Sequence, residues 1–203
     1  MKKVSKIALL MLLVVSLVLS FSCNSGKDAG GSSDIVVDDE NNGSNGRVLV
    51  AYFSATNNTK GVAEKISNAL DADVYRIEPT VAYTSADLNW RDANSRVSRE
   101  SKDLETPEIK DMISNLDDYD VIFIGYPIWG GYAPKIVNIF VENSDFSGKT
   151  IIPFCTSASS GFGQSGNALK NLDKSNATWK DGQRFPGSAS EQTVKAWLDT
   201  LSL

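Results

Sequence analysis

Apolar and polar residues alternate in blocks along residues 47–203, and four of the apolar blocks predict strands. The first and third are near-continuous apolar runs, which is typical of parallel strands covered on both faces. The fourth block gives a weaker prediction, because Pro153 has no backbone N–H to donate to a neighbouring strand. The expected strands are residues 47–53, 73–78, 120–126 and 150–156.

Apolar residues at helical spacing fill the intervals between and after these strands. Pro107 and Pro134 each stand where a helix would begin, and Ser188 with Glu191 forms a candidate capping box for the last helix. The apolar faces of the four expected helices are Val62, Ile66 and Leu70; Ile109, Met112, Ile113 and Leu116; Ile136, Val137, Phe140 and Val141; and Val194, Trp197, Leu198 and Leu201.

Strands that alternate with helices predict a doubly wound α/β fold with a parallel sheet. In such sheets, ligands bind just beyond the carboxyl ends of the strands, near the point where the strand order reverses. Three loops follow predicted strands: residues 53–61 and 156–166 are rich in small polar residues and glycine, and residues 125–134 are rich in glycine and aromatic residues. These loops form the candidate functional site.

The first loop places hydrogen-bond donors at the start of a helix. Its hydroxyls and amides, with the free backbone N–H groups and dipole of the helix, are suited to an anion. The loop contains neither GxxxxGK[ST] nor GxGxxG, so a single phosphate fits it better than a triphosphate or a dinucleotide. An ordinary capped turn is the alternative. The candidate donors are Ser54, Thr56, Asn57, Asn58 and Thr59.

The second loop, "GYPIWGGYAP", combines a proline and paired glycines with two aromatic side chains. Gly130 and Gly131 would let the backbone come close to a flat group, and Trp129 is the aromatic residue expected to face it. Tyr132 is interpreted as a core aromatic. The third loop, "TSASSGFGQSG", offers backbone and hydroxyl donors that could wrap a ligand, with an ordinary surface loop as the alternative.

The three loops, in this order and with these elements between them, resemble the flavodoxin-like FMN-binding family. "SATNNT" is similar to that family's phosphate loop, S/T-x-T-G-x-T, with Asn57 at the glycine position, where asparagine tolerates a positive φ. "YTSADLNW" and "NSRVSRE" resemble a subgroup described as NAD(P)H-dependent oxidoreductases. The resemblance covers residues 47–203. It implies a five-stranded parallel sheet of order 2-1-3-4-5, with helices on both faces and FMN as cofactor.

By this resemblance, each loop contacts a different part of FMN. No side chain need act as an acid or a base, because the cofactor carries the chemistry. The implied contacts are Ser54, Thr56, Asn57, Asn58 and Thr59 for the ribityl phosphate; Pro127, Ile128, Trp129 and Gly130 for the isoalloxazine ring; and Thr156, Ser157, Ser159 and Gly161 for its other side.

The second and third loops contain no Asp or Glu. Flavodoxins that act as low-potential shuttles resemble each other in acidic residues near the flavin, which disfavour the negative charge of the reduced state. The loops here predict a more easily reduced flavin, with hydride passing from a reduced nicotinamide to FMN and then to a quinone-like acceptor. A non-enzymatic electron carrier and a flavin-free binding module on the same fold are the alternatives.

Other chemistries find little support. The chain has no histidine, which excludes Ser–His–Asp and Cys–His catalysis and the usual histidine metal sites. Arg91, Arg96 and Arg99 could recognise an anionic co-substrate, but pairing with local acids such as Asp92 and Glu100 is the favoured interpretation.

Residues 1–22 predict a secretory signal, in which three lysines precede an apolar run at 7–19. A helix over that run rises about 20 Å, too short for a bilayer core of about 30 Å. Ser22 before Cys23 resembles a bacterial lipoprotein signal, with plain cleavage and an incidental cysteine as the alternative. Residues 23–46, rich in Gly, Ser, Asn and Asp, predict a flexible tether. Cys155 is interpreted as a small core residue.

Removal of that signal takes three of the 20 basic residues and none of the 25 acidic ones, which leaves a net charge of −8. Such a charge argues against nucleic-acid binding. We therefore expect an exported protein of the cell envelope, anchored to the membrane through a lipid on Cys23. Its expected partners are a redox donor and acceptor, drawn from NAD(P)H, a quinone or a redox protein.

Overall fold

The computed structural model describes residues 47–203. The secretory signal at 1–22, the tether at 23–46 and the lipidation of Cys23 lie outside the described residues and stay predictions. Within residues 47–203, no helix is both long enough and apolar enough to cross a membrane.

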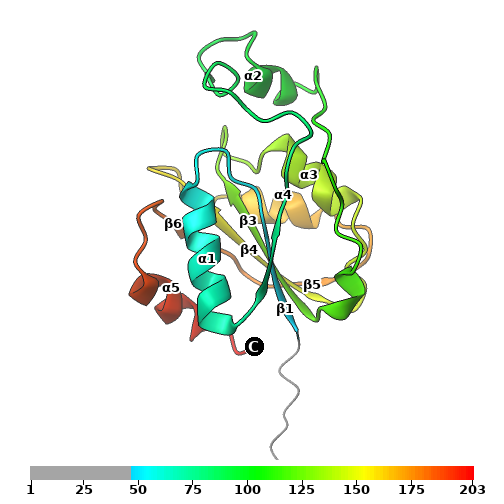
Figure 1. Ribbon diagram of the computed structural model, residues 1–203, viewed down its shortest axis with the longest axis vertical. Coiled ribbons are helices and arrows are strands. Elements are labelled where there is room, and N and C mark those ends of the chain that lie inside the picture. The colour runs from blue at the N-terminus through cyan, green and yellow to red at the C-terminus, as the bar shows by residue number, and fades with distance from the viewer. Residues whose placement is uncertain (1–46) are drawn as a thin grey trace, which may run out of the picture. The chain divides into compact units, whose positions relative to one another are not determined.

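A parallel sheet forms the centre of the described residues (Figure 1). Its strand order is β2-β1-β3-β4-β5, with β6 also paired to β4, which confirms the predicted order 2-1-3-4-5. β1 and β3 run in register from Val48 opposite Val121 to Tyr52 opposite Gly125, so their carboxyl ends meet at one edge. The strands are β1 (Val48–Tyr52), β2 (Asp73–Arg76), β3 (Val121–Pro127), β4 (Thr150–Thr156), β5 (Thr178–Trp179) and β6 (Gln183–Phe185).

The fifth position of the sheet is shared by β5 and β6, which lie along different halves of β4. β5 pairs with Thr150 and Ile151, and β6 pairs with residues 154–156. Pro153 faces the gap between them, because Ile151 O accepts a hydrogen bond from Lys180 N and backbone groups two residues further on point to the same side. The missing N–H of Pro153 therefore interrupts no ladder, and an inner strand accommodates the proline.

Helices cover both faces of the sheet, as predicted (Figure 1). On one face, Val62 and Ile66 of α1 and Val194 of α5 pack against strand residues such as Phe123. On the other face, α3 and α4 cover a second core that includes Phe140. These helices are α1 (Asn58–Leu70), α3 (Lys135–Glu142), α4 (Ser165–Lys170) and α5 (Glu191–Leu198).

The start of α5 differs from the predicted capping box. Ser190 caps the helix by accepting a hydrogen bond from Thr193 N at 3.1 Å, so the prediction of Ser188 as the cap is wrong. Glu191 is the first residue of the helix, where its negative charge is favourable to the helix dipole.

The helix expected from Pro107 does not form. Residues 79–115, called the excursion from here on, contain only one α-helix, α2 (Arg96–Glu100), and are followed by the 3₁₀ turn η1 (Leu116–Asp118). Ile109 forms an antiparallel bridge with Pro79, and Lys110 N donates to Glu78 O at 2.8 Å. Backbone groups held in this extended pairing cannot also form i→i−4 helical bonds, so the predicted helix is wrong.

Candidate functional site

The first loop holds Asn57 in the left-handed region, with φ 64° and ψ 0°, at the N-cap of α1. Glycine adopts this conformation most readily, and asparagine is among the few other residues that tolerate it. Asn57 therefore supports the turn that the sequence resemblance assigns to a glycine.

The start of α1 leaves backbone donors available. No side chain caps the helix, its first turn has no acidic residue, and the first helical bond runs from Gly61 N to Asn57 O at 3.0 Å. Within residues 47–203, the N–H groups of Asn58, Thr59 and Lys60 have no acceptor. These donors, together with the helix dipole, suit an anion.

The side chains of the first loop divide into an exposed and a buried set. Thr56, Asn57 and Asn58 are exposed, and Asn58 Nδ2 donates to Thr56 Oγ1 at 3.2 Å. Ser54 and Thr59 are buried, and Thr59 Oγ1 lies 2.8 Å from Thr156 Oγ1. The exposed set is open to a ligand, whereas the buried threonine pair joins the first loop to the third.

The second loop turns sharply at its paired glycines. Trp129 and Tyr132 exchange backbone hydrogen bonds of 2.9 and 3.1 Å, and the two residues between them, Gly130 and Gly131, both have positive φ. Two consecutive positive-φ residues make a turn that glycine adopts without strain. The turn fixes Trp129 at the carboxyl end of β3.

Trp129 is half-buried within a group of three aromatic rings. Its ring lies 5.5 Å from that of Phe53 and 5.5 Å from that of Tyr83, in edge-to-face orientations. Tyr132, by contrast, is 56% exposed, so its interpretation as a core residue is wrong. The turn follows the end of β3, and it leaves the side chain of Tyr132 uncovered by the rest of residues 47–203.

The third loop begins next to the second, because Ile128 N donates to Thr156 O at 2.9 Å. Thr156 is buried, Ser157 is half-buried and donates through Oγ to Ser160 O, and Ser159 and Gly161 are exposed. Residues from all three predicted loops thus meet at the carboxyl edge of the sheet. Their assignment to parts of FMN stays a prediction.

The third loop also contains the pattern GxGxxG, at Gly161, Gly163 and Gly166. The helix that follows, α4, has only six residues. A side chain at Gly166 would collide with the ring of Phe162, since a Cβ there would lie 2.7 Å from it. The last glycine therefore makes room for an aromatic ring, and the short helix offers little of the dipole that a dinucleotide site uses.

Arg184 on β6 is a site residue that the sequence did not indicate. It lies opposite Cys155 in the sheet. Its Nη2 donates to Ser157 O at 2.6 Å and to Ala158 O at 3.0 Å, so it holds the start of the third loop. Because β6 is three residues long, no hydrophobic pattern marks this arginine as part of the site.

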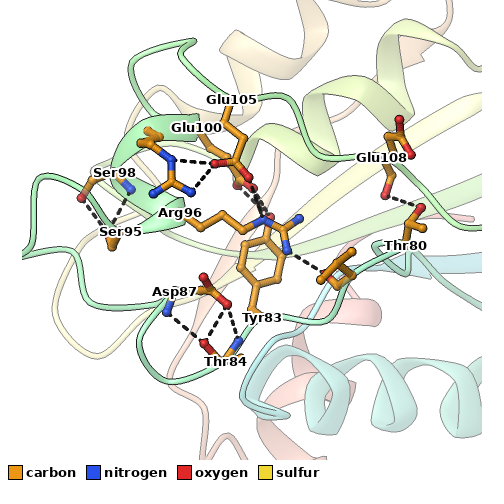
Figure 2. Close-up of polar contacts among 12 residues, drawn as sticks. Thr80, Tyr83, Thr84, Asp87, Ser95, Arg96, Ser98, Glu100, Glu105 and Glu108 are labelled. Atoms are coloured by element: carbon orange, nitrogen blue, oxygen red, sulfur yellow. Dashed lines mark hydrogen bonds and ion pairs between the residues drawn. The ribbon is translucent and has the colours of Figure 1, made fainter.

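The excursion contains a dense polar network (Figure 2). Arg96 Nε donates to Glu100 Oε1 at 2.7 Å, Arg96 Nη1 donates to Val81 O, and Tyr83 Oη donates to both Glu100 oxygens. The guanidinium of Arg96 also lies 4.0 Å from the centre of the Tyr83 ring. Burial raises the pKa of the Glu100 carboxyl, although the bonds from Tyr83 and Arg96 oppose that effect. Burial also raises the pKa of Tyr83.

The arginines of the excursion already have local partners. Arg99 pairs with Glu105 at 2.5 Å, and Arg91 stacks on the exposed ring of Trp90. A cavity of about 370 Å³ is lined by Arg96, Arg99 and Glu105, with further acidic residues around it. Pairing with local acids was the favoured interpretation of these arginines. It holds for Arg96, with Glu100, and for Arg99, although Arg96 is buried rather than exposed.

Cys155 is fully buried, and burial raises the pKa of its thiol to about 12. This confirms its interpretation as a core residue. Among residues 47–203, no group of His, Cys, Asp or Glu is arranged to hold a metal ion. The site therefore offers donors for an anion and flat faces for a ring, with no acid at its loops.

Comparison with known proteins places the chain among flavin-associated folds. The family model for flavodoxins matches residues 47–201. None of the curated proteins compared with the chain matches it.

Three solved structures illustrate the likeness. A candidate flavoprotein from Bacteroides eggerthii is 44% identical with a TM-score of 0.72, over 78% of this chain and 99% of that one. A second, from Bacteroides uniformis, is 42% identical with a TM-score of 0.72, over 76% and 99%. A flavoprotein from Lactobacillus acidophilus, solved in complex with FMN, is 20% identical with a TM-score of 0.59, over 75% and 99%, and shows a shared fold.

Proposed function

The chain belongs to the flavodoxin family of FMN-binding proteins, and we propose that it binds FMN across its three loops and acts as an oxidoreductase. The observation that carries this proposal is the uncapped start of α1. Three backbone N–H groups with no acceptor among residues 47–203, an acid-free first turn and exposed hydroxyl and amide side chains suit the ribityl phosphate.

The remaining residues suit the ring system. Pro127, Ile128 and Trp129 present a half-buried surface at the end of β3, beside the third loop. The ring would lie between these two loops, and its polar edge would meet backbone donors and the exposed hydroxyl of Ser159. No carboxylate of either loop would approach it.

FMN supplies electron transfer in one- or two-electron steps. The protein's residues bind the phosphate, orient the ring and limit its contact with water. Because the loops carry no acid, we propose two-electron exchange, from a reduced nicotinamide or another donor to a quinone-like acceptor. A more easily reduced flavin than that of a low-potential shuttle is part of this proposal.

The first experiment separates phosphate binding from ring binding. We titrate the chain and its Asn58→Asp variant with FMN and with riboflavin, which lacks the phosphate, and follow flavin fluorescence. The added carboxylate should weaken FMN binding by at least about tenfold, or ~1.4 kcal/mol, through repulsion of the phosphate. Riboflavin binding should not change. The apoprotein should gain slightly in stability, because a negative charge favours the start of a helix.

Asn68→Asp is the matched control, since it adds the same charge on an exposed position of the same helix, far from its start. It should leave FMN affinity unchanged. Equal loss of FMN and riboflavin binding in Asn58→Asp would contradict the phosphate assignment. A folded wild-type chain that binds no FMN would contradict the proposed function as a whole.

A second experiment addresses the donor and acceptor. The FMN-loaded chain is mixed with NADH or NADPH and a soluble quinone, and oxidation of the nicotinamide is followed by absorbance. Quinone reduction that requires added FMN supports the oxidoreductase. FMN binding without nicotinamide oxidation, together with rapid reduction by a reduced redox protein, would favour the electron carrier instead.

We also propose that the chain is exported and anchored through Cys23, on the basis of residues 1–23. Labelling of producing cells with a radioactive fatty acid should mark the wild type and not Cys23→Ser. Equal labelling of both would contradict the anchor.

A further inference from the structure

Arg184 carries a charge that forms no ion pair with a carboxylate of the described residues. Among residues 47–203, Arg47, Arg76, Arg96 and Arg99 each form an ion pair with Asp or Glu. Arg184 forms none. Its hydrogen bonds instead go to the third loop, at Ser157 O, Ala158 O and Ser157 Oγ.

The place of this charge is fixed by the sheet. β6 pairs with the last three residues of β4, which sets Arg184 beside Cys155, one residue before the third loop begins. The side chain is half-buried, so water screens its charge only in part. Neither the second nor the third loop has an acidic residue that would offset it. The positive potential of Arg184 therefore extends into the loops.

We propose that Arg184 positions the third loop against FMN and stabilises the negative charge that reduction places on the flavin. This inference rests on the proposed function. In reduction, an external donor delivers two electrons and one proton to the ring, which gains one negative charge. Arg184 binds neither substrate nor proton. It acts through the carbonyl groups that it holds and through its fixed charge.

The expected effect is a preference for reduced over oxidised FMN. At an effective dielectric constant of about 20, a unit charge held next to the loop that contacts the ring favours the charged state by a factor on the order of ten. Loss of the charge should weaken binding of reduced FMN about tenfold more than binding of oxidised FMN. For a two-electron couple, that factor lowers the midpoint potential by about 30 mV.

The test measures the midpoint potential of FMN bound to the full chain, by anaerobic equilibration with reference dyes. Oxidised FMN affinity is measured in parallel by fluorescence titration. Arg184→Gln should lower the midpoint potential by that amount. Arg184→Lys keeps the charge, so its midpoint potential should stay close to that of the wild type. Arg47→Gln is the control, since it removes the same charge from the residue before β1, at the amino ends of the strands and away from the three loops. It should leave the potential unchanged.

Three other results would each count against a proposal. If Arg184→Gln weakens oxidised and reduced FMN equally, the arginine serves only to hold the loop, and the proposed charge effect is overturned. If Arg184→Lys lowers the potential as far as Arg184→Gln, hydrogen bonding rather than charge sets the potential, which also overturns it. Failure of the wild type to bind FMN is a separate result, and it overturns the proposed function.

Discussion

The three loops and the excursion lie near the same end of the sheet, yet they use their polar groups in opposite ways (Figure 1). In the excursion, Arg96, Glu100 and Tyr83 bond to one another and are largely buried. In the loops, the N–H groups at the start of α1 have no acceptor within the described residues. A polar group that already has partners contributes to stability, whereas one without them is available to a ligand.

This difference argues that richness in polar residues alone does not locate a site. The arginines of the excursion are the more conspicuous feature of the sequence, but the structure neutralises Arg96 and Arg99 locally. The first loop contains mostly small polar residues, and the N–H groups at the start of α1 have no acceptor within residues 47–203. We therefore propose that the polar groups of the excursion stabilise the fold and that those of the loops bind the ligand.

Arg96→Met should give the largest effect, because it leaves the Glu100 carboxylate buried without its cation. We expect a loss of about 3–5 kcal/mol in the free energy of unfolding, measured by urea denaturation. The loss should grow with pH. Burial raises the folded-state pKa of Glu100 above its unfolded value, so the variant is most stable at low pH and loses stability as pH rises through the folded-state pKa.

A control for that variant is Lys195→Met, which breaks an exposed pair of the same i,i+4 spacing, Lys195 with Asp199. It should cost less than about 0.5 kcal/mol. FMN affinity of folded Arg96→Met should stay within about twofold of the wild type, an effect below ~0.5 kcal/mol. Similar small losses of stability in both variants would contradict the stabilising role of the excursion. A large loss of FMN affinity in Arg96→Met would contradict its separation from ligand binding.

Thr59→Val should have an intermediate effect, since it leaves the buried Thr156 hydroxyl without its partner. The expected loss is about 1–3 kcal/mol in the free energy of unfolding. Thr59→Val with Thr156→Val should recover most of it, because both hydroxyls are then gone. Thr200→Val, at an exposed hydroxyl, is the control. A double variant no more stable than the single one would show that the bond itself is not the cause.

Asn57→Ala should give the smallest effect, about 1 kcal/mol, because alanine is strained in the left-handed conformation of this residue. Asn57→Gly should keep the stability of the wild type, since glycine adopts that conformation freely. Thermal unfolding of both variants, side by side, measures the difference. Greater stability in the alanine variant would mean that the loop adopts another conformation in solution.

The sequence predicted the four strands β1 to β4, and the turns after three of them, because continuous apolar runs and glycine-rich turns are local signals. Val62, Ile66 and Leu70 define a helix that the structure contains, and the runs at 47–53 and 120–126 are strands. Asn57 was correctly expected to tolerate a positive φ. These features depend on neighbouring residues and on burial, and the spacing of apolar residues along the chain reflects both.

The failures depend on contacts between distant segments. Ile109 has the spacing of a helix, but pairing with Pro79, thirty residues earlier, holds it extended. Tyr132 is aromatic but exposed, because a tight turn projects it from the sheet. Arg184 enters the site through pairing of a three-residue strand with β4. No local pattern carries such information.

The short strands have a consequence for association between copies of the chain. One edge of the sheet ends in β5 and β6, two and three residues long, with a break opposite Pro153. The other ends in β2, which has four residues, and its first and last, Asp73 and Arg76, are charged. An incoming strand needs a long, uncharged row of free backbone groups, and neither edge provides one. The sheet is thus protected on both sides against the edge-to-edge pairing that leads to aggregation.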